Sequence, residues 1–380
     1  MLGALKKHDH TPIGLDLGAS GAKMLQLVRV DGGWSINACG RYDLPRSVPA
    51  DGPQRQEALT EGIRALLASS PFHGRDVVSC LPVSVVQYKN TRMPQMPADE
   101  LAQAVQWEAQ DRLQLGDQGA KIQHLDAGDV RQGDQTRREV ILMGVTDAAL
   151  RDHIHVINST GLNPVSVDVT PTAIARCFAR NIRRQADMEA GHLFIDVGRS
   201  CSKVIILRGH TISFFKLIDI GGDHLDAAVA ENVNLSHDEV ASIRRRLADG
   251  RTAEDDDGKL FGSSRRDSVK QAVGEAVRAV VSTLAREIGL CLRYYSVTFR
   301  GARPTVAQLV GGEAHDAHLV GSLTDQLDLD VQVADPLPGI DRSHPAIAIE
   351  RRDLMPEWAV AGGLVMRRLR HGVWPMRGAA

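Results

Sequence analysis

Paired cysteines and long apolar runs are both missing from this sequence. Its five cysteines are odd in number and widely scattered, and no two form a C-x-x-C pair, which argues against a disulfide framework or a zinc site. No apolar run approaches the ~20 residues that a membrane helix needs, and the first residues hold too short an apolar stretch for a signal peptide. We therefore expect a reduced, cytosolic protein.

A basic excess is missing as well. The 45 Lys and Arg residues stand against 47 Asp and Glu residues, for a net charge of −2. This balance gives no electrostatic reason to expect nucleic-acid binding, which requires a basic face. Apolar residues make up 43% of the 380 residues, enough for buried cores, and the length suggests two to four domains or subdomains.

Two segments, residues 13–23 and residues 194–203, look like copies of one another. Each has an apolar run, an Asp, one apolar residue, a Gly, a small polar cluster and a Lys. Duplicated hairpins of this kind predict two related half-molecules that face a shared cleft. Two Asp-x-Gly turns that meet across a cleft suit the binding of a magnesium–nucleotide phosphate chain.

The residue types of the first hairpin explain this prediction. Gly18 and Gly21 permit positive φ and expose backbone N–H groups to phosphate oxygens, and Ser20 adds a hydroxyl donor. Asp16 cannot attract a phosphate by charge, but it can hold a magnesium ion through water. The alternative is an ordinary hairpin in which the Asp caps the turn; the second copy, with Asp196 in the same place, favours the phosphate site.

Gly311 and Gly312 follow a predicted strand at residues 306–310. Without side chains at these positions, the backbone can lie against a base or a ribose, although a Gly-Gly pair after a strand is commonly only a turn. Gly362 and Gly363 are interpreted instead as a close helix-packing contact between domains.

In this order, the motifs resemble the actin-like ATPase superfamily and, within it, the type IV pilus assembly protein PilM family, which is related to FtsA. The resemblance extends over nearly the whole chain. Besides the two hairpins, it is carried by Met93-Pro94 through Glu100, Trp107-Glu108-Ala109, the segment from Gly161 to Val169, Gly221-Gly222, and Leu235-Ser236 with Glu239.

The resemblance implies an α/β fold of two lobes, each built on an RNase-H-like core, with an FtsA-type subdomain inserted in the first lobe. The expected boundaries are residues 1–82 and 153–190 for subdomain 1A, 83–152 for the inserted subdomain 1C, 191–222 and 306–380 for subdomain 2A, and 223–305 for subdomain 2B. Residues 249–266, dense in mixed charge, are expected to form a mobile surface loop. The residues themselves also predict a polar hairpin at 128–133, a helix with Ser236 as its N-cap, and a long helix over 267–293.

The resemblance also implies an ATP- and Mg²⁺-binding scaffold, cytoplasmic and held at the inner membrane only through its partners. These would be the cytoplasmic tail of a PilN-like membrane protein, bound between the first core and the inserted subdomain, and the pilus motor ATPases; a homo-oligomer is possible. Carried over by position, the nucleotide would contact Asp16, Gly18, Ala19, Ser20, Gly21, Lys23, Asp196, Gly198, Arg199, Ser200, Ser202, Arg244, Gly311, Gly312 and Glu313. Asp16 and Asp196 would hold Mg²⁺ through water.

Some positions depart from the family pattern. Ala241 and Arg244 stand where the family often has an acid and a Lys that hold ribose and adenine, and bulky Arg199 occupies a turn where small residues are usual. Arg244 can stack on adenine, but Ala241 supplies no acceptor for a ribose hydroxyl. The absence of this acceptor predicts reduced nucleotide affinity, whereas Arg199 can either neutralise a phosphate or obstruct it.

Catalysis has one candidate residue, Asp168, at the end of a strand before the connecting helix; its alternative role is to cap that helix. We expect at most a slow ATPase. The alternatives are an FtsA-like membrane-associated filament protein, a small-molecule kinase of the same superfamily, and an adaptor that binds no nucleotide.

Overall fold

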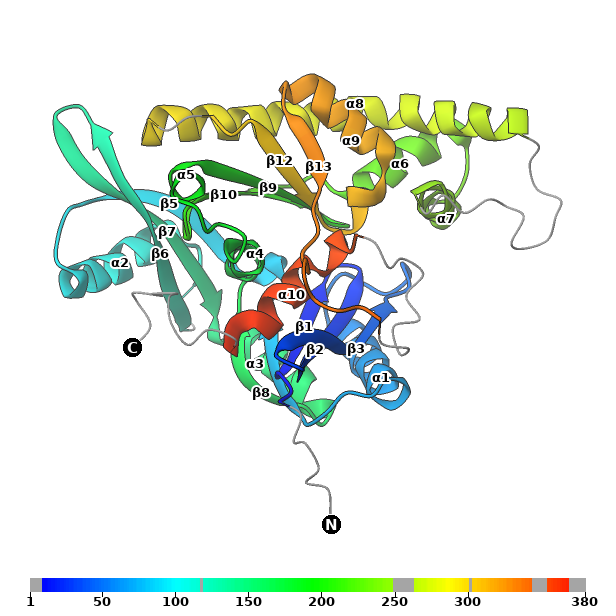
Figure 1. Ribbon diagram of the computed structural model, residues 1–380, viewed down its shortest axis with the longest axis horizontal. Helices are drawn as coiled ribbons and strands as arrows, with labels where there is room; N and C mark the ends of the chain where they lie inside the picture. Colours follow the sequence, from blue (N-terminus) through cyan, green and yellow to red (C-terminus); the bar gives the residue numbers. More distant parts are fainter. Residues whose placement is uncertain (1–8, 117–118, 249–262, 301–302, 344–353, 369–380) are drawn as a thin grey trace, which may run out of the picture. The chain divides into compact units, whose positions relative to one another are not determined.

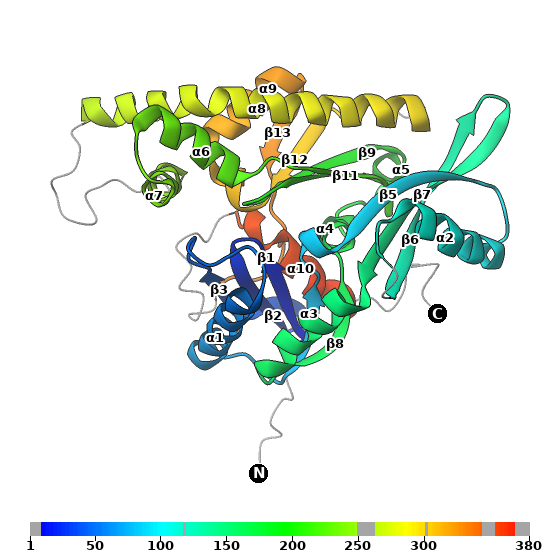
Figure 2. The same ribbon diagram turned by 180° about the vertical axis from the view of Figure 1, so that it is seen from behind.

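The computed structural model describes residues 9–116, 119–248, 263–300, 303–343 and 354–368 (Figure 1). The chain divides into two compact units. Unit 1 comprises residues 1–188, 209–213 and 335–380, and unit 2 comprises residues 189–208 and 214–334. Each unit contains a five-stranded sheet with helices packed on it (Figure 2).

The sheet of unit 1 has the order β3-β2-β1-β4-β8. The strands are β1 (Ile13–Gly18), β2 (Gly21–Val30), β3 (Gly33–Asp43), β4 (Asp76–Cys80) and β8 (Asn163–Asp168). The first three form an antiparallel meander, and β4 and β8 run parallel to β1. Alternate residues of β1, namely Ile13, Leu15 and Leu17, are buried in one apolar cluster together with residues of α1 (Pro53–Ser69) and α3 (Asp147–Ser159).

Helices α4 (Thr170–Ala179) and α10 (Ala359–Val365) pack against each other, and α10 also packs on β1 and β2. Gly14 and Gly363 make this close packing possible. A Cβ on Gly14 would lie 2.7 Å from the Ala361 carbonyl oxygen, and one on Gly363 would overlap the backbone of Ala173. The Gly362-Gly363 pair is therefore a helix-packing contact, as interpreted from the sequence, but it lies within unit 1 and not between two domains, as was expected.

A smaller α/β element is inserted between β4 and α3. It consists of β5 (Gln87–Pro94), α2 (Ala98–Arg112), β6 (Ala120–Gln132) and β7 (Gln135–Thr146), and its sheet has the order β5-β7-β6. Val140 and Leu142 of β7 pack with Leu101 and Val105 of α2. A second apolar cluster contains Met143 and Val145 of the insert together with Leu81 and Val86, and it joins the insert to the core of unit 1.

The sheet of unit 2 has the order β11-β10-β9-β12-β13. Its strands are β9 (Gly191–Val197), β10 (Ser202–Arg208), β11 (Thr211–Ile218), β12 (Val306–Val310) and β13 (Asp330–Val333). One large core combines these strands with α6 (Gly222–Val233), α7 (His237–Ala248), α8 (Ser263–Phe299) and α9 (Ala317–Leu327). The N-terminus of α7 is capped as the sequence predicted, because the Ser236 hydroxyl accepts a hydrogen bond from the Glu239 N–H and Glu239 in turn accepts one from the Ser236 N–H.

The two sheets therefore have the same strand order, with an antiparallel meander followed by two further strands. β12 is parallel to β9 just as β4 is parallel to β1. This equivalence gives structural support to the internal repeat seen in the sequence.

Several bounds differ from the sequence-based expectations. The chain from residue 335 belongs to unit 1, whereas residues 306–380 were expected together in the second lobe, because α10 packs on β1 and α4. Strand β6 ends only at Gln132 and β7 begins at Gln135, so the polar segment 128–133, expected as a hairpin turn, is mostly strand. The long helix predicted over 267–293 extends from Ser263 to Phe299, and residues 249–262 of the expected loop lie outside the described residues.

Candidate nucleotide-binding site

The first hairpin joins β1 to β2 through a tight turn at Ala19 and Ser20. The register pairs Gly18 with Gly21, and Gly21 has φ +139°, a conformation in which a Cβ would collide with the Tyr42 carbonyl oxygen. Ala19 is exposed at the tip. The Leu44 N–H donates to the Ser20 carbonyl at 2.8 Å, which ties the turn to the end of β3.

Asp16 and Lys23 are direct cross-strand partners in this hairpin. The distance between Lys23 Nζ and Asp16 Oδ2 is 3.8 Å, and both side chains are mostly buried. The lysine therefore neutralises much of the charge of the carboxylate. An ammonium group on a flexible stem can also turn toward a phosphate when one is bound.

Arg55 is a residue that the sequence did not single out. It lies in the first turn of α1, and its Nη2 atom donates to the Gly18 carbonyl oxygen at 2.7 Å. A guanidinium group is thereby held at the turn that was predicted to contact phosphate. No sequence motif marks this residue, because α1 is 37 residues away along the chain from that turn.

The second hairpin, between β9 and β10, repeats the arrangement of the first. Asp196 and Lys203 are cross-strand partners, and Lys203 Nζ lies 2.9 Å from Asp196 Oδ2. Both residues are buried. The turn is longer than the first, and the Gly198 N–H closes it by donating to the Cys201 carbonyl at 3.1 Å.

The N-terminus of α6 packs directly on this second turn. The N–H groups of Gly222 and Asp223 donate to the carbonyls of Gly198 and Arg199, at 2.9 and 2.8 Å. Arg199 also forms an ion pair with Asp223, with 3.1 Å between Nε and Oδ1. Its guanidinium group is thus held at the side of the turn, partly neutralised by a carboxylate.

Ser202 lies on the inner side of the same turn. It is fully buried, and its hydroxyl donates to the Ile220 carbonyl at 2.6 Å. Ser200, by contrast, is exposed. Of the two serines predicted to contact nucleotide, the geometry leaves Ser200 accessible and gives Ser202 a structural hydrogen bond.

Gly311 brings the Gly-Gly segment against the second hairpin. It has φ +94°, and a Cβ there would collide with Asp196 Oδ1 and with the Val197 carbonyl oxygen. Gly312 begins the short 3₁₀ helix Gly312–His315, in which Glu313 follows directly. The structure therefore groups Asp196, Lys203 and the Gly-Gly segment at one end of the sheet of unit 2, where the parallel strands β9 and β12 end.

Arg244 lies at the centre of a buried ion-pair cluster. Its Nη1 atom is 2.6 Å from Asp226 Oδ1, and its Nη2 atom is 2.6 Å from Glu313 Oε2 and 2.9 Å from Asp316 Oδ2. Burial acts to lower the pKa of this guanidinium, but the three carboxylates together raise it. Arg244 is thus held by three acidic neighbours, and its stacking on a base stays a prediction.

Glu313 is one of the three carboxylates of this cluster. Burial raises its pKa above the usual range, and the positive charge of Arg244 offsets only part of that effect. Two residues predicted to contact adenosine, Arg244 and Glu313, therefore contact each other. They connect α7 to the segment after β12.

Asp168 also lies in a buried ion-pair cluster. Its side chain is 2% exposed and is paired with Arg176 at 2.8 Å and with Arg367 at 2.9 Å. It also accepts hydrogen bonds from the Val169 N–H and from the Thr172 hydroxyl, so it binds the first turn of α4. Burial acts to raise the pKa of Asp168, but the two arginines and the hydrogen bonds from Thr172 and Val169 together outweigh it and hold the pKa below the ordinary value. The N-cap of α4 is Val169, and no side chain caps that helix, so Asp168 anchors the start of α4 by ion pairs and hydrogen bonds rather than as its cap. Its catalytic role stays a prediction.

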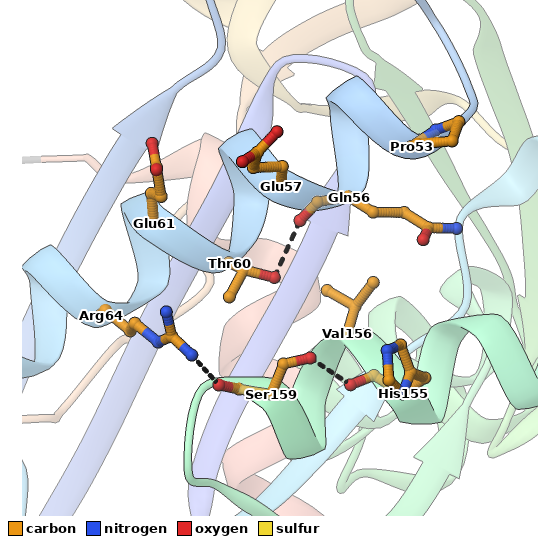
Figure 3. A pocket seen from close by; sticks show the side chains of 9 residues that line it. All are labelled: Pro53, Gln56, Glu57, Thr60, Glu61, Arg64, His155, Val156 and Ser159. Atoms are coloured by element: carbon orange, nitrogen blue, oxygen red, sulfur yellow. Dashed lines mark hydrogen bonds between the residues drawn. The ribbon is translucent and has the colours of Figure 1, made fainter.

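A separate groove of about 300 Å³ lies between α1 and α3 (Figure 3). Polar and apolar groups both line it, and the polar residues include Gln56, Glu57, Thr60, Arg64 and His155. The Arg64 guanidinium reaches across it to the Ser159 carbonyl oxygen at 2.5 Å. None of the residues predicted to contact nucleotide lines this groove.

The repeated sheet order, the paired hairpins and the inserted α/β element together define an actin-like ATPase fold. A solved structure of a PilM–PilN type IV pilus biogenesis complex matches 94% of this chain and 98% of its own chain, with a TM-score of 0.76 and 22% identity. The ethanolamine utilization protein EutJ from Carboxydothermus hydrogenoformans matches 94% of this chain and 89% of its own, with a TM-score of 0.51 and 13% identity. At these identities the likeness concerns the fold.

The family follows from the sequence of the chain itself. The family model of the type IV pilus assembly protein PilM matches residues 14–250, which is more than half of the chain. The chain therefore belongs to the PilM family and is an actin-like pilus assembly protein. No curated protein sequence matches it significantly. Among the described residues, no helix is both long and apolar enough to cross a membrane.

Proposed function

We propose that this protein is an ATP-binding scaffold of the pilus assembly apparatus, in which Mg²⁺-ATP alters the affinity for a PilN-like cytoplasmic segment. The observation that carries the nucleotide part is the repeated Asp–Lys pair. Asp16 with Lys23, and Asp196 with Lys203, occupy the same register at the two turns that follow the first strand of each sheet. A carboxylate for hydrated Mg²⁺ beside an ammonium for phosphate is the pairing that a metal–nucleotide requires.

The residues at the turns fit such a ligand in part. Gly21 and Gly311 keep the backbone free of side chains where a Cβ would collide with neighbouring atoms, and Arg55 and Arg199 add positive charge beside the two turns. The base side fits less well, because Arg244 and Glu313 are bound to each other. We therefore propose weak nucleotide binding that depends mainly on the phosphates and the metal.

In this proposal the chain's own groups have separate tasks. Asp16 and Asp196 orient metal-bound water, Lys23 and Lys203 turn from these carboxylates toward phosphate oxygens, and Arg55 compensates charge at the first turn. Mg²⁺ would neutralise the phosphate chain. None of these groups is an activated nucleophile, so turnover would be slow at most. Nucleotide can change partner affinity only by binding one arrangement of the two units better than another.

Equilibrium binding of a fluorescent ATP analogue tests the nucleotide part. Asp16→Ala is expected to weaken binding about tenfold or more with Mg²⁺ and to have little effect without it, because the carboxylate acts through the metal. Asp51→Ala, at an exposed position in a loop of unit 1, is the matched control. If the wild type binds no nucleotide at millimolar concentration, the protein is a nucleotide-independent adaptor and the switch is excluded.

The partner part rests on the similarity to the PilM–PilN complex and on the insert. We propose that the PilN-like segment binds beside the insert, where Trp107 of α2 is 76% exposed. An exposed Trp on a helix whose other side is packed is typical of a binding hot spot. We also propose that the motor ATPases contact the protein, which would place it at the inner membrane through its partners.

Calorimetry with the cytoplasmic segment of the PilN-like protein tests this part. Trp107→Ala is expected to weaken binding about tenfold, and Val30→Ala, at an exposed site outside the insert, serves as the control. Equal affinities for the wild type and Trp107→Ala would move the partner site elsewhere. Repeating the titration with Mg²⁺-ATP separates the partner site from the nucleotide effect.

A further inference from the structure

The outer side of α8 carries an exposed apolar strip, in which the Tyr294 ring also contacts the Phe214 ring at 5.6 Å between centroids. Leu290, Tyr294 and Val297 are 46%, 37% and 80% exposed, and their spacing of four and three residues puts them on one face of the helix. The opposite side of α8 is packed into the core of unit 2 through Leu284, Ile288 and other buried residues. Large exposed apolar side chains that cluster on one helix face mark an interaction site.

Arginines border this strip. Arg286, Arg293 and Arg300 are all exposed, and none of the three has an ion-pair partner among the residues that the structure describes. Successive residues of an α-helix are 100° apart, so the three arginines lie on the same side of the row formed by Leu290 and Val297. We call these six residues, Arg286, Leu290, Arg293, Tyr294, Val297 and Arg300, the α8 outer face.

Gly289 is a second, independent observation on the same side of the helix. A glycine inside a helix costs about 1 kcal/mol relative to alanine. A Cβ at Gly289 would meet no atom within 4 Å, so the packing of the protein gives no reason for the missing side chain. The glycine leaves a flat site between Arg286 and Arg293, where the side chains of a partner can approach the backbone of α8.

We propose that the α8 outer face is a docking site for an acidic amphipathic helix of a partner protein, independent of the nucleotide site. The apolar strip can contact apolar residues at positions i, i+3 or i+4, and i+7 of the partner helix. The arginines can pair with Asp or Glu residues that flank those positions in the partner. An α-helix offers no unpaired backbone edge, so recognition must occur through side chains, which favours a helical partner over an added strand.

Two other occupants fit the charges less well. Two copies of the α8 outer face would bring their unpaired arginines together, which opposes self-association. An anionic lipid surface would meet Glu287 at the margin of the strip, three residues before Leu290, whereas a partner helix can place a basic residue opposite it. The charge pattern therefore favours a protein partner.

The test uses the full-length chain and a fluorescein-labelled synthetic helix with Leu at three- and four-residue spacing and Glu on its flanks. Anisotropy is expected to show saturable binding that weakens with salt. Val297→Glu and Arg293→Glu should each weaken it about tenfold, while Val30→Glu and Arg131→Glu, exposed substitutions in unit 1, should leave it unchanged. A probe with Lys in place of Glu should bind Arg293→Glu better than it binds the wild type.

Four outcomes would overturn the proposal. In the first, a scrambled peptide of the same composition binds as well as the designed helix. In the second, a Val297→Glu protein with the wild-type melting curve binds the helix undiminished. In the third and fourth, Val297→Glu abolishes a wild-type dimer seen by light scattering, or abolishes binding to vesicles. The last two would assign the face to a second copy or to a lipid surface.

Discussion

Lys203 Nζ lies 2.9 Å from Asp196 Oδ2, and the equivalent pair in the other unit, Lys23 and Asp16, lies 3.8 Å apart in the same register. The second pair along the chain is the more deeply buried of the two. The two hairpins share one sequence pattern, but the lysine lies closer to the aspartate in the second hairpin than in the first. Lys23 is therefore held less tightly than Lys203 and is better able to turn toward a phosphate.

Removal of the two lysines should affect stability unequally. Lys203→Ala leaves the buried Asp196 carboxylate poorly compensated and is expected to cost about 3 kcal/mol, whereas Lys23→Ala should cost less, because its ion pair is longer, at 3.8 Å, and slightly less buried. Because all four Trp residues lie outside residues 189–208 and 214–334, tryptophan fluorescence does not follow unit 2. Hydrogen exchange of β9 and β10 against β1 and β2 measures both effects, and equal losses would contradict the burial argument.

Asp168→Asn separates a structural from a catalytic role. The substitution removes the charge that compensates Arg176, a buried residue, and is expected to destabilise unit 1 by about 3 kcal/mol. ATP turnover per folded molecule, if there is any, should stay the same. Urea unfolding followed by tryptophan fluorescence gives the first quantity and phosphate release gives the second. Lost turnover with unchanged unfolding would restore Asp168 as a catalytic residue.

Arg244→Met should destabilise unit 2 most at higher pH. The raised pKa of Glu313 means that the folded state keeps this proton to a higher pH than the unfolded state, so the contribution of Glu313 is complete at low pH and is lost as the pH rises through the folded pKa. Without Arg244 that pKa rises further. The hydrogen-exchange rates of α6 and α7, corrected for the intrinsic pH dependence of exchange, should therefore rise more steeply with pH in Arg244→Met than in the wild type. Arg244→Lys, which keeps one charge but not the fork, should be intermediate.

His153 should make unit 1 sensitive to acid. Its ring lies 2.9 Å from the Ser79 hydroxyl, and burial lowers its pKa to about 4 from 6.5. Because the folded state disfavours the proton, stability is complete above pH 6.5 and is lost as the pH falls toward 4, by at most about 3 kcal/mol. Urea midpoints by tryptophan fluorescence should fall over this range. His153→Gln keeps a partner for Ser79 and should flatten the dependence; an unchanged slope would assign it to other groups.

Local patterns in the sequence were enough for the order of elements. Apolar runs with a central Asp-x-Gly predicted both hairpins, because two short apolar strands around a glycine turn have few other ways to bury their side chains. Ser236 with Glu239 predicted the start of α7 for the same reason, since both partners of the cap lie within one turn. The family and the actin-like fold followed from the order of these local signals.

Contacts between distant residues were beyond the reach of such patterns. Arg55 reaches the first turn only because α1 packs on the sheet of unit 1, and the chain from residue 335 returns to that unit through glycine contacts of α10. Arg244 was expected at a base and is bound to Asp226, Glu313 and Asp316, up to 72 residues away.

The sequence by itself thus determined the duplicated hairpins, the order of the elements along the chain, and the family. Only the tertiary structure decided which charged side chains of those motifs remain accessible and which are buried in ion pairs. The reason is physical: the alternation of apolar and polar residues reports the face on which a side chain lies, whereas the partner of a buried charge depends on which other element packs against that face.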